Sequence, residues 1–86
     1  MKNTDWQILI TLYDTHSMTK AAELLYMTQS ALTKRVRLME EEWNVEIVKR
    51  SSQGVSFTEN GIYLVKKARI IMDFIGFVEQ YFHVNC

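Results

Sequence analysis

The sequence contains no proline, only three glycines and a single cysteine, Cys86, among its 86 residues. One cysteine cannot form a disulfide within the chain, so a reducing compartment is the simpler expectation. The two histidines lie far apart without a cysteine or acidic cluster at ligand spacing, and we expect neither a metal nor a cofactor. No apolar run approaches the roughly twenty residues that cross a bilayer, which predicts a cytoplasmic protein without a membrane partner.

An excess of basic charge is also lacking, because ten basic residues are balanced by ten acidic ones and the pI is about 6.7. The distribution of charge is more informative than its sum. Residues 28–37 carry three cations, and no aspartate or glutamate occurs between Leu24 and Met39. Four acids follow within a few residues, namely Glu40, Glu41, Glu42 and Glu46. This local positive field indicates an anionic partner, and the neighbouring acids oppose nonspecific binding.

The segment that carries this field has the periodicity of a helix with two different faces. An apolar stripe recurs at i, i+4, i+7 and i+11 through Leu32, Val36, Met39 and Trp43. A polar stripe follows another side of the helix and contains Gln29, Ser30, Thr33, Lys34 and Arg37. At roughly 100° per residue, the centres of the two stripes lie more than ~100° apart. We therefore expect the apolar stripe to be buried while the polar stripe meets the ligand.

Capping residues divide the N-terminal half of the chain into three helices. Asn3, Thr4 and Asp5 offer N-cap chemistry to a first helix that ends near residue 15 or 16. Ser17 can cap a second helix from residue 18 to about residue 26, and Thr28 can cap the third helix after a short turn. Two helices joined by so short a turn form a helix-turn-helix.

Beyond the third helix the sequence predicts a small β-hairpin. Asn44 stands where a left-handed C-terminal cap is expected. The predicted hairpin consists of a strand at Val45, Ile47 and Val48, a turn over residues 51–54 and a returning strand over residues 55–57. Such a wing, with basic residues beside its turn, can reach a phosphate or a minor groove.

The last segment predicts a long helix that is capped by Thr58 and continues to about Phe82. Its apolar residues form a heptad seam, namely Leu64, Ala68, Ile71, Ile75, Val78 and Phe82. A second apolar line runs alongside through Tyr63, Ile70, Phe74, Phe77 and Tyr81. The helix is roughly 35 Å long, which is more than so small a domain covers. We therefore expect a homodimer through this helix, with folding back onto its own domain as the alternative.

Several spaced motifs occur in one register, namely SMTKAA at residues 17–22, Leu25, TQSALT at residues 28–33, LMEEEWNV at residues 38–45, Arg50 and TENG at residues 58–61. Together they resemble the N-terminal domain of LysR-type transcriptional regulators. The resemblance extends from Trp6 to about Met72 and covers nearly the whole chain. Because several motifs must agree at once, the resemblance is specific.

The resemblance implies a mainly α fold, with a winged helix-turn-helix of three helices and a two-stranded wing over residues 1–57. A dimerising linker helix and tail then occupy residues 58–86. The implied partner is double-stranded DNA, which a homodimer binds at a dyad-symmetric promoter site. The large effector-binding domain of the family is absent from this chain, which is therefore expected to be either an excised DNA-binding fragment or a truncated product, with the fragment favoured.

The expected DNA contacts come from the third helix and the wing. Residues at the N-terminal end of a recognition helix enter the groove most deeply, which favours Gln29, Ser30 and Thr33 for base contact, with Lys34 next. The full set of expected DNA-binding residues is Thr28, Gln29, Ser30, Thr33, Lys34, Arg37, Arg50 and Gln53. Arg35 points between the two faces and can simply be solvated. Glu40 can pair with Arg37 on the exposed side of the helix.

Two other classes of function compete with this interpretation. A winged-helix module for protein interaction or dimerisation, without DNA binding, would keep the same fold. An enzyme is the weaker alternative, because no nucleophile, base and orienting group occur at usable spacing and we expect no catalytic residues.

Overall fold

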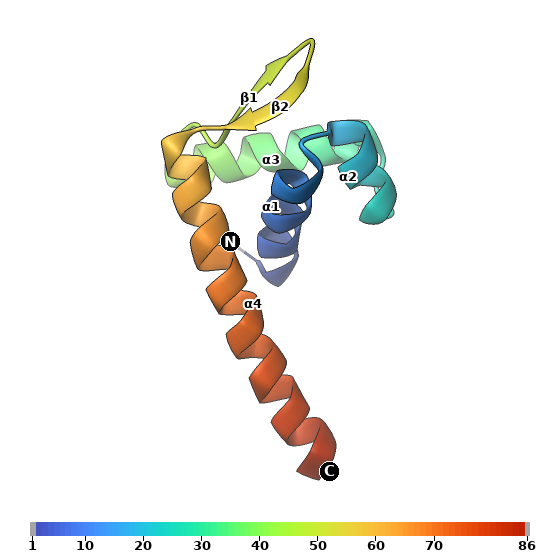
Figure 1. Cartoon of the computed structure of the whole chain (residues 1–86), viewed down its shortest axis with the longest axis vertical. Coiled ribbons are helices and arrows are strands. Elements are labelled where there is room, and N and C mark those ends of the chain that lie inside the picture. Colours follow the sequence, from blue (N-terminus) through green and yellow to red (C-terminus); the bar gives the residue numbers. More distant parts are fainter. Residues whose placement is uncertain (1, 86) are drawn as a thin grey trace.

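The computed structural model describes residues 2–85, which form four helices and one two-stranded hairpin in the expected order (Figure 1). The elements are α1 (Asn3–Thr15), α2 (Met18–Leu24), α3 (Gln29–Trp43), β1 (Val48–Ser51), β2 (Gly54–Phe57) and α4 (Glu59–Asn85). The predicted fold class, mainly α with a wing and a long last helix, is confirmed. Cys86 lies outside the described residues. Among those described, no helix combines the length and hydropathy that a membrane span requires.

Three of the predicted N-caps are confirmed by hydrogen bonds. The hydroxyl oxygens of Ser17, Thr28 and Thr58 accept the backbone N–H of the residue three positions later, at 3.1, 3.1 and 3.0 Å. Asn44 closes α3 in the left-handed conformation, with φ of 53°. The first helix differs from expectation, because Lys2 is its N-cap and Asn3, Thr4 and Asp5 all lie within its first turn.

The core is formed where α1, α2, α3, the beginning of α4 and the base of the wing meet. Its fully buried apolar residues are Leu9, Leu12, Ala21, Leu32, Met39, Ile47 and Ala68. The prediction that Trp43 belongs to the buried stripe of α3 is wrong, because its side chain is 47% exposed. The chain reverses at Asn44, and Ile47 closes the core at this end of α3 instead. Helix α2 also ends earlier than predicted, because Tyr26 adopts a left-handed conformation with φ of 56°.

The wing begins later than predicted. Antiparallel pairing starts at Val48 opposite Phe57 and ends at Ser51 opposite Gly54, so Val45 and Ile47 precede the strand. The backbone N–H of Ile47 donates to the carboxylate of Glu40 at 2.8 Å instead of to a strand. This bond also corrects the expected pairing of Glu40 with Arg37.

The wing is attached to the loop between α1 and α2. The backbone N–H of Val55 donates to the carbonyl oxygen of His16 at 3.1 Å, and the His16 ring Nδ1 lies 3.1 Å from the carbonyl oxygen of Val55. Gly54 has φ of +117°, and a Cβ at this position would lie 2.7 Å from the His16 carbonyl oxygen. Only glycine therefore fits where the wing joins the body of the domain.

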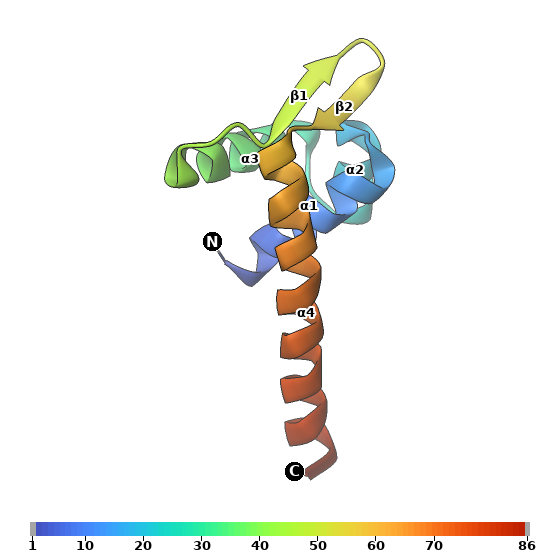
Figure 2. The same cartoon turned by 60° about the vertical axis from the view of Figure 1, so that its left-hand side comes forward.

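Helix α4 has a buried beginning and an exposed continuation. Leu64, Val65 and Ala68 are buried in the chain's own core, where α4 packs against α1. Farther along, the helix extends beyond all other elements in both views (Figures 1 and 2). Leu64 and Ala68 are therefore covered within the chain, which corrects the expectation that they face a second copy.

Candidate nucleic-acid interface

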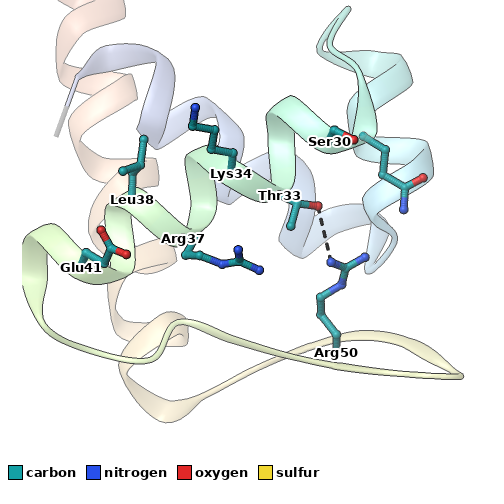
Figure 3. Close-up of a pocket in the computed structure, with 8 residues that line it drawn as sticks. Ser30, Thr33, Lys34, Arg37, Leu38, Glu41 and Arg50 are labelled. Atoms are coloured by element: carbon teal, nitrogen blue, oxygen red, sulfur yellow. Dashed lines mark hydrogen bonds between the residues drawn. The ribbon is translucent and has the colours of Figure 1, made fainter.

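Helix α3 and the wing enclose an open hollow of about 680 Å³ on the surface of the domain (Figure 3). It is lined by Gln29, Ser30, Thr33, Lys34, Arg37, Leu38, Glu41 and Arg50. Six of the eight residues predicted to contact DNA are therefore gathered around one surface. Thr28 and Gln53 do not line it. The hydroxyl oxygen of Thr28 accepts the Ala31 amide, and Gln53 lies at the tip of the wing.

The wing and α2 both contact the predicted reading side chains. A guanidinium nitrogen of Arg50, on β1, donates to the hydroxyl of Thr33 at 3.5 Å. One turn earlier on α3, the hydroxyl of Thr19 on α2 donates to the side-chain oxygen of Gln29 at 3.3 Å. Thr33 and Arg37 point from α3 toward the wing, and Lys34 points away from it (Figure 3). Two neighbouring elements thus orient polar side chains that remain accessible.

The charge of this surface is predominantly positive and uncompensated. Lys34, Arg37 and Arg50 are exposed, and within residues 2–85 none of them forms an ion pair. Glu41 is the one acid that lines the hollow among the described residues. Cations that are solvated and unpaired are available to neutralise phosphates or to donate to guanine.

Lys49 is the wing's other basic residue, and it does not belong to the hollow. Its ammonium group lies 3.9 Å from a carboxylate oxygen of Glu46, and both side chains are largely exposed. This arrangement agrees with a charge on an edge strand rather than with a contact site.

Arg35 is not simply solvated but has a partner that the sequence did not predict, Asp5. Its guanidinium donates two hydrogen bonds to Asp5, from Nε at 2.7 Å and from a terminal nitrogen at 2.6 Å. The Asp5 side chain is fully buried, and its carboxylate also accepts the backbone N–H of Lys2 at 3.0 Å. The burial of Asp5 could have been predicted from its position, because it shares one helical face with the buried Ile8, Leu9 and Leu12.

The ion pair makes stability depend on pH in a predictable direction. The Arg35 hydrogen bonds hold the pKa of Asp5 below its ordinary value of 3.8, although burial acts in the opposite sense. A lowered pKa in the folded state stabilises the protein above the unfolded-state pKa, and this contribution is lost as the pH falls through the folded-state pKa. We therefore expect the Tm difference between the parent and D5N to shrink as the pH is lowered from about 6 to about 3. A difference that stays constant over this range would contradict the assignment.

The exposed part of α4 carries many large apolar side chains. Large apolar side chains that are 59–71% exposed lie at Tyr63, Ile70, Phe74, Phe77, Tyr81 and Phe82, and Val78 is 41% exposed. Ile71 and Ile75 are half-buried. Beyond Ala68, the remaining heptad residues and the second apolar line thus share the segment of α4 that the rest of the chain leaves largely exposed, whereas Tyr63 lies near the start of the helix.

Comparison with known proteins places this geometry in a family. Residues 4–62 match the family described as bacterial regulatory helix-turn-helix proteins of the lysR family. The chain is 36% identical over 69 residues to an uncharacterised transcriptional regulator, YraN, of Bacillus subtilis, with 80% of this chain and 24% of the relative covered. It is 31% identical over 72 residues to the transcriptional regulator OxyR of Escherichia coli, with 84% and 24% covered.

These relatives are much longer than the chain, which spans about a quarter of their length. Two solved structures match nearly all of it. The DNA-binding domain of CbnR in complex with DNA has a TM-score of 0.92 at 22% identity, with 99% of this chain and 98% of that chain covered. The DNA-binding domain of BenM with benA site 1 DNA has a TM-score of 0.92 at 21% identity, with both chains covered completely.

Proposed function

The chain belongs to the LysR family of bacterial regulatory helix-turn-helix proteins, and we propose that it binds a specific double-stranded DNA site as a homodimer in the cytoplasm. The observation that carries the proposal is the hollow between α3 and the wing, where polar and unpaired basic side chains meet. An interaction module without DNA binding would not need this accessible positive surface. The relatives are described as transcriptional regulators, and the proposal includes no catalytic role.

In the proposed complex, α3 enters the major groove and the wing contacts the flanking backbone or minor groove. Gln29 can pair bidentately with adenine, and Ser30 and Thr33 can meet base edges or a thymine methyl group. Lys34 and Arg37 reach guanine or phosphate, while Arg50 contacts phosphate beside the groove. Thr28, at the start of α3, and Gln53, at the tip of the wing, lie outside the hollow. We assign them peripheral contacts with DNA.

The proposed dimer uses the exposed part of α4, because that surface is apolar and no other part of the described chain covers it. The proposed interface contains the heptad residues Ile71, Ile75, Val78 and Phe82. It also contains the neighbouring apolar line through Ile70, Phe74 and Phe77. The proposed division therefore keeps residues 1–57 as the reading head and residues 58–86 as the linker, with the first turns of α4 packed into the head.

Substitutions in the hollow separate base reading from phosphate contact. Q29A should relax the preference at one base pair, because a bidentate contact contributes about 1–3 kcal/mol of discrimination. R50A should weaken binding to all sequences to a similar extent, because a phosphate contact carries no sequence information. Both effects can be measured by titrating each variant against a library of single-base operator changes. If Q29A kept the parent's preference at every position, Gln29 would not read a base.

A further inference from the structure

The ion pair between Asp5 and Arg35 connects the beginning of α1 to the middle of α3, across 30 residues of sequence. Asp5 is the one charged residue that is buried among those described. Both of its carboxylate oxygens accept hydrogen bonds, so the buried charge is paired and satisfied. A buried and fully hydrogen-bonded charge restricts geometry more than an apolar contact does, because a small displacement leaves it unsatisfied.

The location of Asp5 shows which two parts of the domain this ion pair holds in place relative to each other. Helix α1 packs closely against α4, so Asp5 belongs to the same body as the beginning of the linker helix. Arg35 lies on α3, one residue after Lys34 and two before Arg37, both of which line the hollow. The pair therefore joins the helix that faces DNA to the body from which the linker helix extends.

Arg35 differs from the other cations of α3 because it does not line the hollow. Its planar guanidinium is engaged in parallel hydrogen bonds with both oxygens of Asp5. Two such bonds fix the orientation of the group as well as its distance, whereas an ammonium group makes a point contact around which the helix can turn.

We propose that Asp5 and Arg35 are a positioning pair, whose two parallel hydrogen bonds set the angle at which α3 presents its reading side chains to the groove. This inference rests on the proposed function. Arg35 then contributes to specificity without touching a base or a phosphate. A change in angle displaces Gln29, Ser30 and Thr33 together, so discrimination is lost at several base pairs at once and not at a single one.

The test uses R35K, which keeps a positive charge beside Asp5 but removes the planar fork. The matched control is R69K, because Arg69 also forms an ion pair with α1, an exposed one with Asp14 at 2.5 Å. Each variant is titrated against single-base changes of a half-site selected by the parent, at a temperature where its circular dichroism shows it fully folded. Failure of the parent to select any DNA would refute the proposed function, whereas the positioning inference is judged on variants of a parent that binds.

We expect R35K to lose discrimination at several half-site positions at once, by about tenfold when the positions are summed. This total is comparable to the loss of one good base contact. R69K should discriminate like the parent. The proposal is overturned if R35K discriminates like the parent, if it weakens all sequences equally as a lost phosphate contact would, or if it changes one position only. Should R35K not fold, D5N/R35Q removes the buried charge while keeping an amide hydrogen bond, and the same three outcomes decide.

Discussion

Replacing Gly61 by alanine should destabilise the folded domain by about 3 kcal/mol, because the added methyl group has no space. Gly61 is buried in the first turn of α4, where it packs against the chain just before the wing. A Cβ at this position would lie 2.1 Å from the carbonyl oxygen of Ile47 and 3.0 Å from a ring carbon of Phe57. The nearest obstacle is backbone, and its carbonyl oxygen already accepts the N–H of Thr58 at 2.9 Å. Neither side can move without breaking the junction between the wing and α4.

Gly76 provides a matched control on the same helix, because a Cβ there meets nothing within 4 Å. G76A should stabilise the protein by roughly 0.5–1 kcal/mol, since alanine favours a helix more than glycine does. Urea denaturation of both variants gives the two free energies of unfolding directly. If G61A lost no more than about 1 kcal/mol, the close approach of α4 to Ile47 would be wrong.

Replacing both Phe74 and Phe77 by serine should convert the protein into a monomer and weaken binding to a dyad-symmetric site by about 10²-fold or more. The two rings are 68% and 71% exposed within the chain, so their removal leaves the domain's own core unchanged. Burying such a ring against a second copy contributes roughly 1.5 kcal/mol or more. A monomer also loses the gain in effective concentration that links the second half-site to the first.

The mass in solution tests this prediction independently of DNA. At micromolar concentration the parent should have twice the chain mass of 10.2 kDa, and the double variant should have the single mass. Y26S is the control, because Tyr26 is 97% exposed but lies in the turn between α2 and α3. It should keep the parent's mass. A parent that is monomeric at this concentration would contradict the proposed dimer.

The parts of the fold that sequence could predict are those that depend on neighbouring residues. Ser17, Thr28 and Thr58 cap the helices that follow them because a hydroxyl reaches an amide three residues away. The buried positions Leu32, Val36 and Met39 follow from the helical period alone. The same period separated the polar stripe of α3, which is why most of the predicted DNA contacts gather in one hollow.

The parts that sequence could not predict depend on contacts between distant residues. Arg35 faces Asp5 across 30 residues, and no local pattern pairs these two positions. Glu40 accepts the amide of Ile47 because the chain reverses between them, so the start of the strand could not be read from β propensity. Trp43 shares the apolar period of α3, but its exposure depends on where Ile47 returns to the core. In α4, periodicity identifies the apolar seam but not where its contact with the domain ends.

Selection of bound DNA from a random pool tests the central claim most directly. A selected dyad requires both a surface that recognises bases and two DNA-binding domains held together in one dimer. The proposal predicts that the enriched sequences share a dyad of two half-sites, with centres about one helical turn or a multiple of it apart. One protein dimer should bind each selected site. Recovery of no common sequence would contradict sequence-specific binding, and recovery of a single asymmetric site bound by one chain would contradict the paired reading heads.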